Sequence, residues 1–157
     1  MINLREKKYI SYYIILALIL VSLIFSMIFF FSKGLGQRKT FIFPSAREGK
    51  YVLEYRYLRS FGDSSYDYYL KYFVDELLLG SGVERTKKIF TPGTRVESCF
   101  LRDGILYLNL SGDLINMGTD TVNIKEGVKL LELNINTNFS KVKKIQLFID
   151  GNLAFEN

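Results

Sequence analysis

Residues 9–32 read YISYYIILALILVSLIFSMIFFFS and carry no charged side chain. A helix of this length is about 36 Å long, which is enough to cross a hydrocarbon core of about 30 Å with some tilt. The alternative is a buried core helix, but a helix that is apolar on every face needs a large protein around it, and the remaining chain is too short to provide one. The stretch therefore predicts a membrane anchor that carries the rest of the chain.

Charge is distributed unevenly around this anchor. Residues 1–39 hold six lysines and arginines against one glutamate, whereas residues 40–157 hold fifteen charges of each sign. Basic residues on both flanks of an apolar helix suit anionic lipid head groups, while nucleic-acid binding requires a net basic face on the folded domain. The sequence therefore predicts a membrane partner, through residues 9–32, and no nucleic-acid partner.

The leader before the anchor indicates the topology. Residues 1–8 are short and basic, which is the usual form of a signal anchor with a cytoplasmic N-terminus. No Ala-x-Ala site precedes a plausible junction, so we expect no cleavage, and residues 33–39, with two glycines, are expected to form a tether. Residues 40–157 then form an extracytoplasmic domain of a single-pass cell-membrane protein.

The domain lacks the side-chain sets that catalysis usually requires. Its roughly 118 residues suffice for one modest core. Cys99 is the only cysteine, which excludes an intramolecular disulfide, and histidine is absent. No phosphate loop, nucleophile elbow or metal-ligand cluster is present, and the adjacent acids Asp75 and Glu76 diverge by about 100° on a helix. We expect no catalytic residue, no cofactor and no metal, and so no enzyme.

The first part of the domain predicts two strands. Residues 41–43 form a short apolar run before Pro44, and residues 51–58, YVLEYRYL, alternate at strand period. Glu54 and Arg56 lie on the mixed face of the second strand, where we expect an exposed ion pair of little energetic value. The opposite face, which we expect to be buried, carries Tyr51, Leu53, Tyr55 and Tyr57.

A helix is predicted over residues 66–79. Ser64 and Ser65 are candidate N-caps, apolar residues repeat at helical spacing, and Gly80 supplies a stop. Ordinary packing is the favoured role of the tyrosines concentrated here, and a stacking platform for sugars or bases is the alternative. These tyrosines are Tyr66, Tyr68, Tyr69 and Tyr72.

The next segment predicts an antiparallel hairpin. Two apolar runs, residues 94–101 and 105–110, flank Asp103-Gly104, a pair suited to a turn with positive φ. Parity places Val96 and Phe100 toward the core and Cys99 on the opposite, exposed face. We expect Cys99 to be a passive strand residue, because no partner for a reactive thiol accompanies it.

Periodicity is ambiguous in residues 123–139. Five apolar residues follow helical spacing, while part of the same stretch alternates as a strand would, and four asparagines weaken a helix. The longer helical stripe favours a helix. Residues 143–149 then alternate as a strand, and Asp150-Gly151 forms a turn.

Three segments resemble the GerMN domain family of sporulation and germination proteins: FVDELLLG (73–80), FTPGTRVESCFLRDGILYLNLS (90–111) and VKKIQLFIDG (142–151). FIFP and LEYRYL extend the resemblance to about residues 40–152 and contain the family's Glu-x-Arg at Glu54 and Arg56, whereas Ser81 stands where the family usually has proline. The resemblance implies an α+β fold in which two helices cover one face of a mixed or antiparallel sheet. It also implies a split βαβ core akin to ring-building domains, beside the one N-terminal transmembrane helix, and no established enzymatic activity.

These features predict a non-catalytic cell-envelope protein whose domain binds an envelope protein partner or copies of itself. The alternative is a binder of cell-wall glycan or another small ligand, because the chain has eleven tyrosines and thirteen phenylalanines. A groove lined by the helix tyrosines would favour the ligand, and inward packing would disfavour it. The interaction surface is expected at Glu54, Arg56, Tyr66, Tyr69, Arg85, Lys87 and Lys88, although a solvated loop is the alternative for the last three.

Overall fold

The computed structural model describes residues 4–32, 36–47, 49–59, 65–116, 118 and 120–154. The chain divides into two compact units at Gly36. The first contains helix α1, Leu4–Ser32, and the second contains the other helices and strands that the structure describes. Within α1, the window Tyr12–Phe30 is long and apolar enough to cross a membrane, and its side chains are exposed. The predicted apolar helix is thus confirmed.

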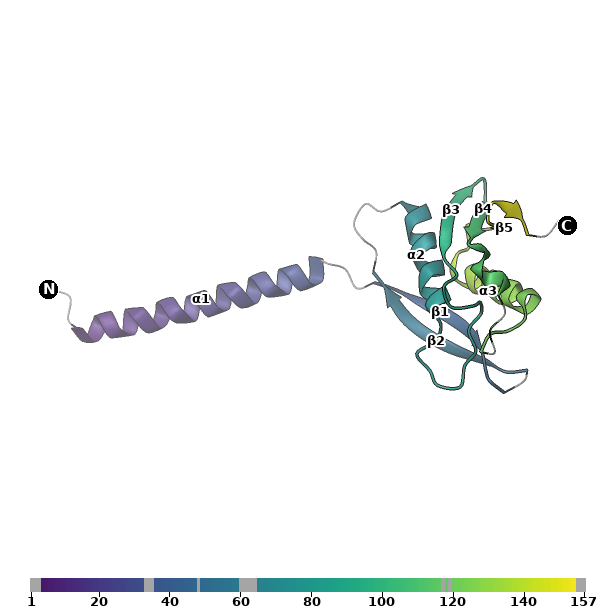
Figure 1. The fold of residues 1–157 in the computed structure, drawn as a ribbon. Coiled ribbons are helices and arrows are strands. Elements are labelled where there is room, and N and C mark those ends of the chain that lie inside the picture. The colour runs from purple at the N-terminus through teal and green to yellow at the C-terminus, as the bar shows by residue number, and fades with distance from the viewer. Residues whose placement is uncertain are drawn as a thin grey trace. The chain divides into compact units, whose positions relative to one another are not determined.

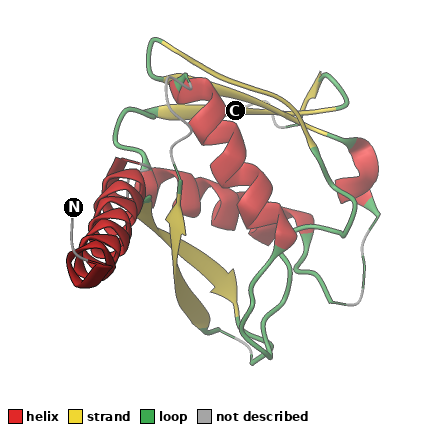
Figure 2. Cartoon of the chain, turned by 90° about the vertical axis from the view of Figure 1, so that its left-hand side faces the viewer, coloured by secondary structure: helices red, strands yellow, loops and turns green. Residues whose placement is uncertain are grey.

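The second unit has three layers. A four-stranded sheet forms one outer layer, a two-stranded hairpin forms the other, and helices α2 and α3 lie between them (Figure 1, Figure 2). The elements are β1 Gln37–Pro44, β2 Tyr51–Leu58, α2 Tyr66–Leu79, β3 Val96–Arg102, β4 Ile105–Leu110, the short 3-10 helix η1 Gly112–Ile115, α3 Ile124–Asn138, β5 Lys144–Ile149 and β6 Asn152–Leu153.

The fold class is the α+β class expected from the sequence, with two helices on one face of a mixed sheet. The strand order of that sheet is β3-β4-β5-β6, with β4 parallel to β5 and the other pairs antiparallel. Two details differ from the expectation. First, β1 and β2 form a sheet of their own. Second, the βαβ unit is not split, because β4 and β5, which α3 connects, are direct neighbours with no strand between them.

Helix α2 begins and ends where the sequence predicted. Ser65 has extended backbone angles, and its side chain accepts a hydrogen bond from the Tyr68 backbone N–H, so it is the N-cap. Gly80 ends the helix with φ of 91°, a conformation that side chains with a Cβ rarely adopt. One face of α2 buries Leu70, Phe73, Val74 and Leu77.

The β3–β4 hairpin forms as predicted, but the parity predicted for β3 is wrong. A β-bulge between Val96 and Ser98 shifts the register, and side chains beyond it change faces. Cys99 therefore faces the core, where burial raises the pKa of its thiol to about 12. Phe100 lies on the outer face and stacks on Tyr107 at 5.1 Å between ring centroids.

Helix α3 confirms the helical choice for residues 123–139. Asn123 is its N-cap, because the amide oxygen accepts a hydrogen bond from the Glu126 backbone N–H. Leu131 and Ile135 are completely buried. They join one core with the inward leucines of β4 and with Phe41 and Phe43 of β1.

The hairpin departs from the sequence expectation in two ways. β1 begins at Gln37 rather than residue 41, so residues 37–39 belong to the strand and the tether is shorter than predicted. The exposed face of β2 is also the opposite of the one predicted. Phe41 and Phe43 bury the hairpin's inner face against α2, with the Phe41 and Phe73 rings 4.7 Å apart. The charged pair of β2 lies on that inner side, and the Arg56 guanidinium lies over these two rings.

Candidate functional site

Arg56 lies at the centre of a group that ties β2 to the C-terminal end of α2. Its guanidinium donates to Oε1 of Glu54 at 2.8 Å, to the main-chain oxygen of Glu76 at 3.1 Å and to that of Gly80 at 2.6 Å. The second oxygen of Glu54 accepts from the Ser81 hydroxyl at 2.7 Å. We call Glu54, Arg56, Glu76, Gly80 and Ser81 the clasp. It satisfies carbonyls that a helix end leaves without intrahelical partners.

The expectation that the Glu54–Arg56 pair is exposed is wrong. Both side chains are 19% exposed, and the Arg56 guanidinium lies 4.7 Å from the centroid of Phe41. The hydrogen bond from Arg56 is the largest influence that holds the pKa of Glu54 below its usual value. The family's Glu-x-Arg motif thus stabilises the fold here, since its charges are engaged within the domain.

Two asparagines of α3 bind the outer edge of β1. The Asn134 side chain accepts from the Ile42 backbone N–H at 2.8 Å and donates to the Ile42 carbonyl at 2.9 Å. One helical turn later, Asn138 does the same for Thr40, at 2.9 and 2.6 Å. A carboxamide presents a donor and an acceptor together, so each asparagine replaces the partner that a neighbouring strand would supply. The outer edge of β1 is closed there.

The basic loop residues Arg85, Lys87 and Lys88 were predicted as part of the interaction surface. The backbone of this loop continues the closure of the β1 edge. The Lys87 N–H donates to the Pro44 carbonyl at 2.8 Å, and the Ala46 N–H donates to the Arg85 carbonyl at 2.7 Å. Arg85 is exposed at φ of 62°, whereas Lys87 and Lys88 are half-buried. The cluster thus supports the hairpin as a loop, and the role of its side chains in binding stays a prediction.

Tyr66 and Tyr69 pack inward rather than lining a groove. Both rings lie edge-on to Phe139, with centroids 6.1 and 6.0 Å away, and burial raises the pKa of both phenols. The buried Lys39 ammonium lies 4.3 Å from the Phe139 centroid and donates to the Asn138 carbonyl at 3.0 Å. Desolvation lowers the pKa of Lys39.

The other two tyrosines of α2 lie closer to solvent. Tyr68 is half-exposed, and Tyr72 is partly buried beside Glu76. The four rings therefore do not converge on one groove. Since inward packing of these rings was the stated criterion against a ligand platform on α2, the geometry disfavours that platform.

An exposed row on β2 escaped the sequence reasoning. Its four side chains are exposed by between 53% and 67%, and they are Tyr51, Leu53, Tyr55 and Tyr57. We call these four residues the β2 row. The guanidinium of Arg38 covers the Tyr55 ring at 4.1 Å. The Glu-x-Arg motif itself could have revealed this row. A charged pair that binds a helix end must point toward that helix, so the alternate residues of the strand must point to solvent.

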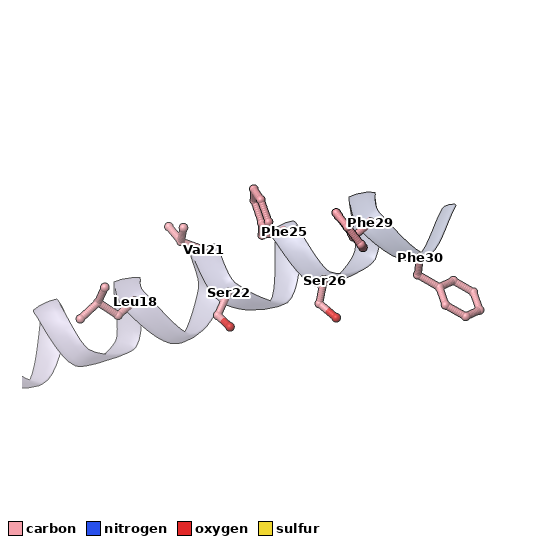
Figure 3. A pocket seen from close by; sticks show the side chains of 7 residues that line it. All are labelled: Leu18, Val21, Ser22, Phe25, Ser26, Phe29 and Phe30. Carbon is pink, nitrogen blue, oxygen red and sulfur yellow. The ribbon is translucent and has the colours of Figure 1, made fainter. Parts of the chain in front are cut away.

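Two surface hollows lie in the described part of the chain. One, of about 210 Å³, lies at the hairpin turn and is lined by polar and charged residues that include Ser45, Lys50, Lys87 and Glu126. A second runs along α1 between Leu18 and Phe30, with Ser22 and Ser26 on it, and has no wall besides the helix itself (Figure 3). The described residues contain no cluster of three metal-ligating side chains.

Comparisons with known proteins place this geometry in a family. A curated relative, an uncharacterized lipoprotein of Treponema pallidum, is 29% identical over 84 residues, which are 54% of this chain and 63% of that protein. Less than two thirds of that relative is therefore matched. Residues 42–154 match the family Germane, described as "Sporulation and spore germination".

Solved structures agree at the level of the fold. The first GerMN domain of the Bacillus subtilis sporulation protein GerM superposes with a TM-score of 0.52 at 17% identity, over 74% of this chain and 85% of that one. The tandem GerMN domains of the same protein give 0.54 at 17% identity, over 76% and 41% of the two chains. The family match spans most of the chain and contains α2, α3, β2 and the four-stranded sheet, so this protein belongs to the Germane family of sporulation and spore germination domains.

Proposed function

We propose that this protein is a non-catalytic, membrane-anchored component of the cell envelope whose GerMN-like domain binds other proteins or copies of itself outside the cytoplasm. The observation that carries the proposal is the β2 row, since exposed aromatic and leucine side chains gathered on one strand are typical of a protein interface. Tyrosine in particular is enriched where proteins bind one another.

The anchor supports the location. Helix α1 has the length and composition of a membrane span, and its flanks are basic. The matched Treponema relative is a lipoprotein by its printed name, which places that protein at a membrane as well. Only residues 33–36 separate α1 from β1, so the domain stays within a thin layer beside the bilayer. Confinement of this kind raises its effective concentration for neighbours in the same layer.

The adjacent acids of α2 are engaged in ion pairs within the domain. Asp75 pairs with Lys71 at 2.7 Å, and Glu76 pairs with Arg56 at 3.4 Å. A general acid or base needs a carboxyl that is free to reach a substrate proton. Their geometry therefore supports a binding function over a hydrolytic one.

Cell-wall glycan is the second candidate ligand. The exposed rings of Tyr51, Tyr55 and Tyr57 favour it, because sugar faces stack on aromatic rings. The platform would then be on β2 rather than on α2, where the sequence placed it.

Photo-crosslinking of the full chain in its native membrane tests the proposal. A photoreactive amino acid replaces Tyr57 or Glu84, both of which are exposed, and a matched control replaces Lys129 on the exposed face of α3. Glu54 is unsuitable for this purpose, since a probe there would break the clasp.

We expect defined protein adducts from Tyr57 or Glu84 and none of the same adducts from Lys129. Glycan adducts, together with sedimentation of the full chain with purified cell wall, would support the second candidate. The absence of protein adducts from both positions would contradict the proposed function.

A further inference from the structure

Three of the sheet edges in the described chain are protected. Side chains of α3 and the loop at Arg85–Lys87 close β1, as described above. At β3, a carboxylate oxygen of Asp67 in α2 accepts from the Leu101 backbone N–H at 2.8 Å. β6 contains only two residues. Natural proteins use such devices because an unprotected edge is a template for another strand.

β2 is the exception among the described strands. Thr40 and Ile42 turn their backbone groups outward to α3, so their partners Tyr55 and Leu53 occupy the non-hydrogen-bonded positions of the antiparallel pair. The N–H and C=O groups of Tyr55 and Leu53 consequently point away from β1. No hydrogen bond joins these groups to another described residue.

The open edge and the β2 row belong to the same residues. Every second residue of β2 directs its backbone groups outward from the hairpin and its side chain to the exposed face. A strand added here would gain main-chain hydrogen bonds from the edge and apolar contacts beside the row. This combination is the geometry of β-strand addition.

The charges on the hairpin indicate which kind of strand would bind at this edge. In the described hairpin, every exposed charged side chain is cationic, and none of these cations pairs with an acid of the described chain. They are Arg38, Arg47, Lys50 and Arg59. Glu54, the one acid described there, is neutralised in the clasp. Resting on the proposed protein-binding function, we propose that an extended, acidic segment of a partner protein adds to the free edge of β2 as a further strand.

A second copy of the hairpin is a poorer occupant than an acidic strand. Antiparallel pairing of two β2 strands about Glu54 would bring Lys50 of each copy beside Leu58 of the other, next to Arg59. Like charges placed together in this way repel one another, while opposite charges across an interface favour association. The same cations would complement the carboxylates of a partner strand.

A proline at position 53 tests the edge directly. The Leu53 N–H points outward, so Leu53→Pro removes no bond of the β1–β2 ladder, and proline is tolerated at such edge positions. The matched control, Leu53→Thr, also removes the leucine side chain but keeps the N–H. Each variant of the full chain carries the photoreactive residue at Tyr57, and protection of the single cysteine, Cys99, from a thiol reagent reports that the domain is folded.

We expect Leu53→Pro to lower the yield of the Tyr57 adduct by about tenfold or more, because it removes a donor and places a ring at the edge. Leu53→Thr should retain the adduct within about threefold. Mass spectrometry should locate the adduct in a segment rich in Asp and Glu, and Lys50→Glu should weaken it.

Four outcomes would overturn the inference: equal yields with proline and threonine, an adduct to a second copy, an adduct to lipid, or no adduct at Tyr57. A probe at Glu84 separates the two proposals. Protein adducts at Glu84 that persist in Leu53→Pro, while the Tyr57 adduct is unaffected or absent, would support the protein-binding function and contradict the strand-addition site. Loss of adducts at both probes in the unsubstituted chain would remove both.

Discussion

At the scale of single residues, Asn134 and Asn138 of α3 lower the helix propensity of the segment but make hydrogen bonds to β1. Asparagine disfavours a helix interior by several tenths of a kcal/mol, roughly 0.6. Asn134 recovers more than this, because its carboxamide serves both backbone groups of Ile42 and also donates to the Leu130 carbonyl at 2.8 Å. Two of the four asparagines that made the helix doubtful in the sequence, Asn134 and Asn138, therefore hold it against β1.

Replacement of Asn134 by alanine should destabilise the domain by about 3 kcal/mol. The change leaves the buried N–H and C=O groups of Ile42 without partners, at about 1–3 kcal/mol for each group, and the gain in helix propensity offsets only a small part. Urea unfolding of the full chain in micelles measures this, with pulse labelling of the half-buried Cys99 thiol as the signal for the domain.

Asn136→Ala is the matched control, because Asn136 lies on the exposed face of the same helix. It should leave stability within about 0.5 kcal/mol of the parent or raise it slightly. Equal effects of the two substitutions would show that the bonds to β1 contribute nothing beyond propensity.

At the scale of elements, periodicity predicted the helices well and the faces of strands poorly. α2 matches its predicted bounds because a cap, an apolar stripe and a stop agree along one local segment. On β2, both faces carry apolar residues, so alternation alone could not decide which face is buried. The clasp decides it, and the clasp depends on Gly80 and Ser81, more than twenty residues further along the chain.

The bulge in β3 shows a second limit of local patterns. One extra residue between Val96 and Ser98 reverses the parity of the remaining strand, so Cys99 is inward and Phe100 outward. No turn residue or proline marks the bulge in the sequence. Strand alternation and the family resemblance both pointed to Glu54 and Arg56 as candidate interaction residues, and only three-dimensional contacts reveal that both are engaged in the clasp.

Gly127, in the first turns of α3, should resist a change that helix propensity favours. Alanine stabilises an average helix interior by about 1 kcal/mol relative to glycine. Here the added Cβ would lie 2.6 Å from the Ile89 carbonyl oxygen and 2.7 Å from the Phe90 ring. We expect Gly127→Ala to lower stability by about 2 kcal/mol, because overpacking outweighs propensity.

The same urea experiment checks this prediction. Lys129→Ala, at an exposed position of α3, is the control and should change stability by less than about 0.5 kcal/mol. A Gly127→Ala variant that is more stable than the parent would show that α3 can move away from Ile89 without cost.

At the scale of the whole molecule, the chain is a domain with its own core joined to an apolar helix. The core residues all come from the unit that follows Gly36, and the apolar side chains described on α1 are exposed. The two units therefore meet different requirements, since the helix needs a hydrocarbon solvent and the domain needs water. The side of the membrane on which the domain lies determines which partners it can meet.

Thiol labelling in intact cells determines this side with little background. Burial raises the pKa of Cys99 to about 12, so its reactive thiolate is rare at neutral pH in the folded domain. A cysteine at the exposed position Glu84 should react with a membrane-impermeant reagent in intact cells. A cysteine at Lys7, before the apolar window of α1, should react only after lysis, because basic leaders remain in the cytoplasm. Labelling of Glu84→Cys only after lysis would place the domain inside the cell, where envelope proteins and cell-wall glycan could no longer be its ligands.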